Sequence, residues 1–192
     1  MTSRLTGLRW LAGATLGLVL WATHPQPAYA LEELRSFVHP KLGKVSLLVP
    51  VEWTLQERLD PDTLTVFVRF LPPASGLFDF EVAVAETAAL RNEALNRRDL
   101  EAHVRQVSAA ALPQSVEGQV TPQRFGLRRD ESLYARLTDK APAPDEFLLV
   151  TKGVRLQGRR AMLFTLYSND TDGALLKRAL DLVSSFTFEP FP

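Results

Sequence analysis

Residues 63–71 (TLTVFVRFL) and 78–85 (FDFEVAVA) decide the fold class of this chain. Both stretches are rich in β-branched and aromatic residues, and a turn-prone PPASG at 72–76 joins them, so they predict two paired strands. In the second stretch apolar and polar residues alternate, because Phe78, Phe80, Val82 and Val84 share one face while Asp79 and Glu81 share the other. The alternation predicts a sheet with one face in the core and one face in solvent.

More strands are predicted on both sides of this pair. Upstream, residues 34–38 (LRSFV) and 44–49 (KVSLLV) flank a turn-rich connection and predict a hairpin. Downstream, β-prone stretches predict a second, longer sheet segment at 115–125, 132–138, 146–156 and 159–167.

Two segments have helical spacing instead. After Asp99, a suitable N-cap, Leu100, Val104, Val107 and Ala111 recur at helical intervals, and this helix should stop before the proline at 113. A second helix should open at 171–173 and end near Ser184 or Ser185. Its apolar stripe comprises Leu175, Leu176, Ala179, Leu182 and Val183.

These elements together predict one α+β domain over residues 31–192. Its architecture should be an α/β/α sandwich, a mostly antiparallel sheet covered by helices. The APAP stretch at 141–144 is too short to link two domains and is expected to form a loop between strands.

Residues 1–30 have the three zones of a cleavable signal peptide. Arg4 and Arg9 precede an uncharged apolar run at 10–22, which is shorter than the roughly 20 residues that span a bilayer. A helix-breaking THPQP follows, and Ala28 and Ala30 provide the small residues that a signal peptidase accepts. We therefore expect cleavage after Ala30 and a periplasmic or secreted mature protein, or a lumenal one if the source is phototrophic.

The sequence contains no cysteine, which excludes disulfides, thiolate metal sites, thiol nucleophiles and a lipid anchor on an amino-terminal cysteine. Removal of residues 1–30 takes away two arginines and no acidic residue, which leaves a net charge of −2. A nucleic-acid or anionic-membrane binder is expected to be basic, so neither class is favoured.

Several of these stretches, in their order along the chain, resemble the PsbP/Mog1/DcrB-like superfamily. The first is the V-P-x-x-W element of Val49, Pro50 and Trp53, the second is LFTLY at 163–167, and the third is the helix that runs into VSSF at 183–186. Each element alone is common, so the specificity of the resemblance lies in their order across most of residues 31–192.

The resemblance implies an antiparallel sheet with helices on both faces, and it implies little about activity. Members of the superfamily include extrinsic proteins of the lumenal side of photosystem II, a Ran-binding nuclear protein and exported bacterial proteins. The better-understood members bind protein partners and are not catalysts. Some photosystem members carry metal-binding histidines, but no position of this sequence matches those ligands.

Candidate catalytic and metal-binding groups are few. Asp79 and Glu81 share a strand face, an arrangement that general acid–base catalysis can use, but carboxylates on a polar sheet face are more often simply solvated. His39 and His103 are the only histidines after residue 30, and they lack the spacing of a zinc site. His39, which precedes a proline, is expected in a turn, and His103 beside the apolar stripe of the first helix. No catalytic residue, metal site or cofactor is therefore predicted.

Residues 168–173 (SNDTDG) superficially resemble a calcium-binding loop, with oxygen-bearing side chains and a glycine at the sixth place. The place of the bidentate glutamate is occupied by Ala179. This stretch is better interpreted as a turn in which Thr171 or Asp172 caps the following helix.

Three features could bind a partner. Trp53, the only tryptophan after residue 30, is expected in the core or at a sheet edge, with a partner contact as the alternative. The tail at 186–192 could form a last edge strand or stay exposed for docking. Basic doublets could form a patch if the fold gathers them, although scattered surface charge is the simpler reading, and they are Arg97–Arg98, Arg128–Arg129, Arg159–Arg160 and Lys177–Arg178.

The sequence therefore predicts an exported, soluble, non-enzymatic binding or assembly protein that acts through contact with an unidentified protein partner. A photosystem II-type extrinsic factor is the specific form of this prediction for a phototrophic source. The alternative is a small-molecule or lipid carrier, or a weak hydrolase, with a pocket between sheet and helix.

Overall fold

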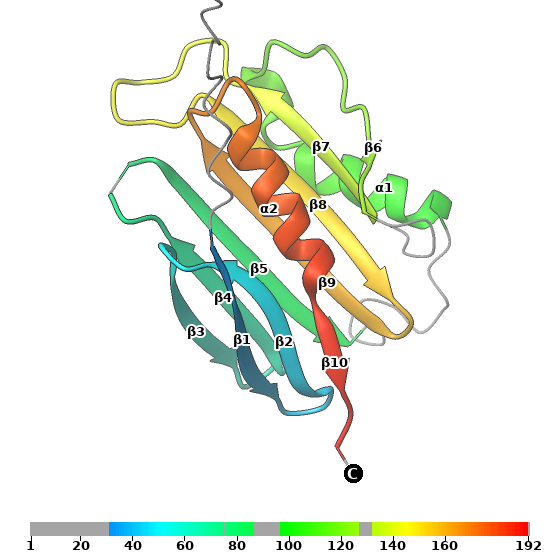
Figure 1. Cartoon of the computed structure of the whole chain (residues 1–192). Helices are drawn as coiled ribbons and strands as arrows, with labels where there is room; N and C mark the ends of the chain where they lie inside the picture. Colours follow the sequence, from blue (N-terminus) through cyan, green and yellow to red (C-terminus); the bar gives the residue numbers. More distant parts are fainter. Residues whose placement is uncertain (1–30, 75, 87–96, 127–131, 192) are drawn as a thin grey trace, which may run out of the picture.

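The computed structural model describes residues 31–74, 76–86, 97–126 and 132–191 (Figure 1). The predicted signal peptide, with Ala28 and Ala30, lies outside the described residues, as do Arg128 and Arg129. No helix in the described part of the chain is both long enough and apolar enough to cross a bilayer.

The described elements form two antiparallel sheets and two α-helices. The small sheet has the order β1-β2-β10, and the large sheet has the order β3-β4-β5-β9-β8-β7-β6. The strands are β1 Glu32–His39, β2 Gly43–Pro50, β3 Thr54–Asp60, β4 Thr65–Leu71, β5 Phe78–Glu86, β6 Gln123–Arg124, β7 Ser132–Thr138, β8 Leu149–Gln157, β9 Arg160–Ser168 and β10 Thr187–Glu189. The helices are α1 Arg97–Ser108 and α2 Ala174–Ser185, and a 3-10 turn η2 spans Leu112–Gln114.

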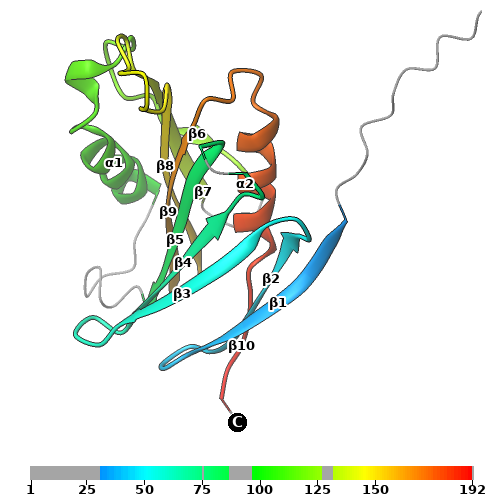
Figure 2. The same ribbon diagram turned by 90° about the vertical axis from the view of Figure 1, so that its left-hand side faces the viewer.

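The helices lie on opposite faces of the large sheet, and the small sheet lies on the same side as α2 (Figure 2). The main core fills the space between the large sheet, the small sheet and α2, and it contains the apolar face of β5 that the alternation predicted. A second apolar cluster, which includes Leu100 and Val104, packs beneath α1. The α+β architecture with helices on both faces is therefore confirmed.

The prediction of a strand at 115–125 is wrong for most of its length. Only Gln123–Arg124 forms a strand, and Ser115 makes an isolated bridge to Asp139. Gly118 and Pro122 explain the difference, because glycine weakens a strand and proline cannot donate to the hydrogen-bond ladder.

Both helices end where the sequence predicted, α1 before Pro113 and α2 at Ser185, but both start at other residues than predicted. Helix α1 begins at Arg97, so Asp99 lies in its first turn, and it ends at Ser108. Beyond Ser108 the chain tightens, because the Ala111 N–H donates to the Ser108 carbonyl at 3.1 Å before Pro113 is reached. The N-cap position of α2 is occupied by Gly173 in a left-handed conformation, φ 82°, and not by Thr171 or Asp172, although the Asp172 side chain still accepts a hydrogen bond from the Ala174 N–H.

The C-terminal tail forms an edge strand, one of its two predicted states. Strand β10 pairs antiparallel with β2, with Phe188 opposite Val45. Phe186, which precedes it, is 1 % exposed and belongs to the main core, whereas Phe191 is 54 % exposed. The tail therefore supplies the third strand of the small sheet, at the edge opposite β1.

His39 is not the turn residue that the sequence suggested, because it is fully buried at the end of β1. Its Nε2 lies 3.2 Å from the carbonyl of Val84 on β5, and its Nδ1 accepts hydrogen bonds from the N–H groups of Lys41 and Leu42. Since a carbonyl can only accept, Nε2 carries the proton and the ring is neutral. The ring thus joins the small sheet to the large one.

Acidification is expected to destabilise the fold through His39. Burial lowers the pKa of His39 below its ordinary value of 6.5, and the hydrogen bond to Val84 and the charge of Glu86 offset that only in part. The unfolded chain therefore binds a proton before the folded chain does, so stability is complete above pH 6.5 and falls as the pH drops below it.

Urea denaturation over a pH series measures this effect. The wild-type chain from Leu31 should lose up to about 1.4 kcal/mol of stability per pH unit below pH 6.5, relative to His39→Gln, which cannot titrate. Parallel pH curves for the two chains would contradict the assignment.

Candidate functional site

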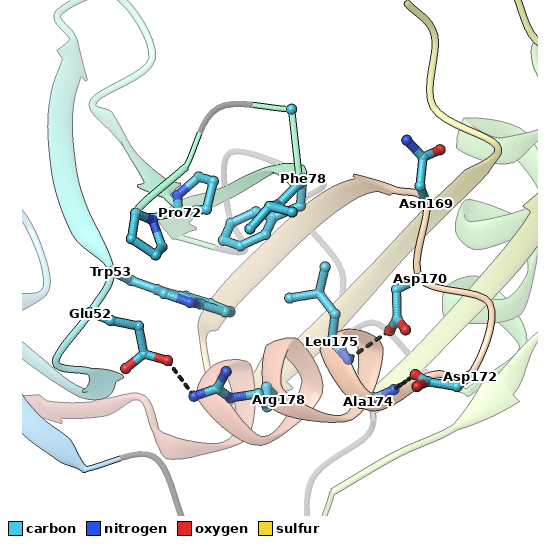
Figure 3. Close-up of a pocket in the computed structure, with 13 residues that line it drawn as sticks. Glu52, Trp53, Pro72, Phe78, Asn169, Asp170, Asp172, Ala174, Leu175 and Arg178 are labelled. Atoms are coloured by element: carbon cyan, nitrogen blue, oxygen red, sulfur yellow. Dashed lines mark hydrogen bonds and ion pairs between the residues drawn. The ribbon is translucent and has the colours of Figure 1, made fainter. Parts of the chain in front are cut away.

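A pocket of about 560 Å³ opens between α2 and one end of the large sheet (Figure 3). Three connections and the first turns of α2 line it: the turn between β2 and β3, the turn between β4 and β5, and the segment between β9 and α2. We call it the α2 pocket, and its lining residues are Glu52, Trp53, Pro72, Pro73, Gly76, Leu77, Phe78, Asn169, Asp170, Asp172, Ala174, Leu175 and Arg178.

Trp53 anchors the pocket to the core. Its N–H donates to the Pro50 carbonyl at 2.9 Å, and its side chain is 2 % exposed. The indole packs against Phe78, with ring centroids 4.7 Å apart, and against Phe70 and Phe80. The prediction of a core tryptophan is confirmed, and the aromatic cluster gives the pocket a rigid wall.

Glu52 and Arg178 form an ion pair beside this wall. The Arg178 Nη2 donates to the Glu52 Oε1 at 2.5 Å, and the Arg178 guanidinium lies 5.7 Å from the centre of the Trp53 ring (Figure 3). Burial raises the pKa of Glu52, but hydrogen bonds from its own backbone N–H and from Arg178 outweigh that and lower the pKa. Glu52 is therefore held as a charged partner of Arg178 and is not a free general base.

Two aspartates hold the N-terminus of α2 at the other side of the pocket. The Asp170 Oδ2 accepts hydrogen bonds from the N–H groups of Leu175 at 2.6 Å and Leu176 at 3.3 Å. The Asp172 Oδ1 accepts one from the Ala174 N–H at 2.9 Å. The side chain of Asp170 and the N–H of Ala174 lower the pKa of Asp172. These bonds replace the side-chain cap that Gly173 cannot supply.

Removal of the Asp170 carboxylate is expected to loosen this end of α2. Asp170→Ala should lower the free energy of unfolding by about 1 kcal/mol, because two N–H groups of the first turn lose their acceptor. Urea denaturation measures the loss. Asp145→Ala, in the exposed loop between β7 and β8, is the control and should lie within about 0.5 kcal/mol of wild type. Equal losses in both variants would contradict the capping role.

Asp79 and Glu81 lie on the face of β5 that points away from the main core, and neither lines the α2 pocket. Asp79 accepts hydrogen bonds from the Arg69 Nε at 2.9 Å and Nη2 at 2.8 Å. Asp79 and Glu81 are thus part of a solvated polar face of the sheet and not a catalytic pair. In the described part of the chain, no three histidine or acidic side chains come together to hold a metal ion.

The described basic doublets lie on different elements: Arg97–Arg98 begin α1, Arg159–Arg160 lie where β8 turns into β9, and Lys177–Arg178 lie on α2, on the opposite face of the large sheet from α1 (Figure 2). Arg159 pairs with Glu86 across 3.7 Å, and the Arg160 guanidinium lies over the Phe188 ring. On α2, Lys177 pairs with Asp181 while Arg178 pairs with Glu52. Each of these four side chains therefore already contacts an acidic or aromatic side chain.

Sequence reasoning did not find the α2 pocket as a set of residues. The Glu52–Arg178 pair joins side chains that are 126 positions apart, and the Pro72–Pro73 turn was identified only as a connection. The V-P-x-x-W element and the SNDTDG stretch were the available signals, because both of them end at this pocket.

Comparison with known proteins finds a similarity in structure but none in sequence. The sequence matches no protein-family model and no curated protein. The structure is similar to the solution structure of cyanobacterial PsbP (CyanoP) from Synechocystis sp. PCC 6803, with 15% sequence identity and a TM-score of 0.47. The match covers 87% of this chain and 99% of that one. No residue role is transferred from it.

Proposed function

We propose that this protein is an exported, non-enzymatic binding protein that contacts a protein partner through the α2 pocket. The observation that carries the proposal is the construction of the pocket, an open depression with an aromatic wall, an exposed apolar rim and acidic groups. Leu77 on the rim is 54 % exposed, whereas Trp53 behind it is held by the core. Aromatic and arginine side chains in a rigid pocket are typical of the residues that dominate binding energy in protein interfaces.

The carboxylates of the α2 pocket already have hydrogen-bond partners, which favours binding over catalysis. Glu52 is paired with Arg178, and Asp170 and Asp172 cap α2. A general base or nucleophile has to reach substrate with its reactive atom, and these carboxylates already serve the structure. The SNDTDG stretch is therefore assigned a capping role.

Export is the second part of the proposal, and it is supported by residues 1–30 and by the start of the fold. Strand β1 begins at Glu32, directly after the predicted cleavage position. Amino-terminal sequencing of exported material should read Leu31 first, and a start within the apolar run would contradict cleavage. For a phototrophic source, the thylakoid lumen and a photosystem II partner are the specific form of the proposal.

A small-molecule or lipid carrier is the second candidate, because about 560 Å³ lies within the usual volume range of ligand sites. Such sites normally enclose most of their ligand, whereas this pocket is largely open to solvent. Native mass spectrometry of protein purified from its own cells would reveal a retained small ligand and would favour the carrier.

Site-specific photo-crosslinking in the source cells tests the protein-binding proposal. A photoreactive residue at Leu77 should give one discrete protein adduct, because Leu77 is exposed at the rim. The same residue at Val116, which is 67 % exposed and absent from the pocket, is the matched control and should not give that adduct.

An affinity measurement with the captured partner completes the test. Leu77→Asp should weaken binding about tenfold or more, since a charge would replace an apolar contact, whereas Val116→Asp should not. The absence of an adduct at Leu77, or an equal effect of both aspartates, would refute the protein-binding role.

A further inference from the structure

Strand β1 forms an outer edge of the small sheet. It pairs along its whole length with β2, and no other described strand pairs with it. Figure 2 shows β1 at the border of the small sheet. The outer side of this eight-residue strand, which has no partner strand, leaves a row of backbone donors and acceptors open to another chain.

The register shows which residues have these open groups. The Val51 N–H donates to the Leu31 carbonyl at 2.8 Å, so Leu31 and Val51 form a hydrogen-bonded pair. Because hydrogen-bonded and non-hydrogen-bonded pairs alternate in an antiparallel ladder, the next residue, Glu32, directs its backbone groups away from β2. The same holds for Leu34, Ser36 and Val38.

Apolar side chains accompany this open edge. Leu34 is 65 % exposed, Val38 is 66 % exposed, and Leu48, directly opposite Leu34 on β2, is 42 % exposed. Strand β3, at one edge of the large sheet, has the exposed polar residues Gln56, Glu57 and Arg58 in its middle. Strand β1 is charged as well, at Glu32, Glu33 and Arg35, so its distinction as a docking edge is the exposed apolar Leu34 and Val38 beside its open backbone groups.

The charges next to Leu34 are self-complementary. Glu33 and Arg35 flank it and are bonded to one another, with Arg35 Nε donating to Glu33 Oε1 at 2.7 Å. If two β1 strands pair antiparallel about Leu34, Glu33 of each copy lies opposite Arg35 of the other. Two ion pairs would then form at equivalent places, as a two-fold interface requires.

We propose that two copies of this chain associate through β1, antiparallel, with Leu34 opposite Leu34 of the second copy. The two small sheets then form one continuous sheet of six strands. The backbone groups of Glu32, Leu34 and Ser36 pair across the two-fold axis, and the leucines at 34 and 48 of both copies line up in one row on its outer face.

Charge selects this register over its neighbours. A shift of the two-fold axis to Arg35 would place the two arginines opposite one another, which is repulsive. A shift to Ser36 would oppose Arg35 to Phe37 and leave no opposite charges in contact. A second copy is therefore the occupant that matches the charge pattern of this edge.

Charge-reversal variants test the interface, with light scattering after size exclusion as the readout. Wild type should have twice the mass of one chain. Arg35→Glu alone and Glu33→Arg alone should each have the mass of a single chain, because like charges then face one another. A mixture of the two variants should recover the dimer mass, since opposite charges meet again.

The recovery in the mixture separates a lost interface from a lost fold, and circular dichroism should show the same fold for all three chains. A wild-type chain that is monomeric at its highest soluble concentration would overturn the proposal. A mixture that stays monomeric, although wild type is dimeric, would overturn the register.

Engineered cysteines test the position of the two-fold axis, and the absence of native cysteine makes the readout unambiguous. Directly opposed residues in an antiparallel pair have Cα atoms about 5.5 Å apart, within reach of a disulfide. Leu34→Cys should therefore cross-link under mild oxidation about tenfold faster than Val116→Cys, an equally exposed control. Equal rates would refute the register.

Discussion

Arg155→Met is expected to lower the free energy of unfolding by about 3 kcal/mol. Arg155 lies on β8, is 4 % exposed, and donates from Nη1 to the carbonyls of Val183 at 2.8 Å and Phe186 at 3.2 Å. These carbonyls lie at the C-terminal end of α2, where the last turn has no helical donors and where a positive charge is favourable. Methionine fills much of the same space but leaves both buried carbonyls without this donor.

Urea denaturation of the variant and of two companions measures the effect. Arg155→Lys retains the charge and should lose less than Arg155→Met. Arg69→Met removes an arginine that is 48 % exposed and paired with Asp79, and it should cost less than about 1 kcal/mol. Similar losses for Arg155→Met and Arg69→Met would show that the buried arginine does not hold α2 in place.

Gly153→Ala is expected to destabilise the protein by about 2 to 3 kcal/mol. Gly153 on β8 lies directly opposite Phe164 on β9, and the Phe164 ring covers the glycine. A Cβ at this position would lie 2.3 Å from Phe164 Cζ and 2.7 Å from the Leu133 carbonyl oxygen. The ring has little room to move, because it packs edge-on against Phe80 and Phe125.

A double-mutant cycle locates the cause of this loss. Phe164→Leu removes the ring edge, so the double variant Gly153→Ala with Phe164→Leu should lose less stability than the sum of the single variants. Gly118→Ala is the matched control, because no atom lies within 4 Å of its added Cβ, and it should be neutral or slightly stabilising. Additive losses would show that the ring is not the obstacle.

Most of the fold could be predicted from local patterns. Alternation along β5, the hairpin of β1 and β2, and the apolar stripe of α2 each follow from side-chain periodicity, and all of them are present. The prediction was wrong where a β-prone composition was interrupted, at residues 115–125, and imprecise where a cap came from outside the usual position, at α2. Periodicity reports which face is buried, but it does not report which strand will find a partner.

The candidate site was predictable only in fragments. Trp53 and the SNDTDG stretch were noticed, but the sequence could not show that both border one pocket with Pro72 and Arg178. His39 illustrates the same limit, because its role depends on the carbonyl of Val84, which is 45 positions away. Contacts of this kind are set by the packing of the two sheets and not by neighbouring residues.

The sequence by itself determined the α+β class, the antiparallel hairpins, the helical stripes and the absence of thiol chemistry. These properties depend on the identity and spacing of residues within a few turns or strands, which local sterics and burial control. Only the tertiary structure decided that Asp170 caps α2, that Arg155 holds its far end, and that Glu52 meets Arg178 beside Trp53. The physical reason is that each of these contacts satisfies a polar group with a donor or acceptor from a distant segment, and only the packed chain brings the two together.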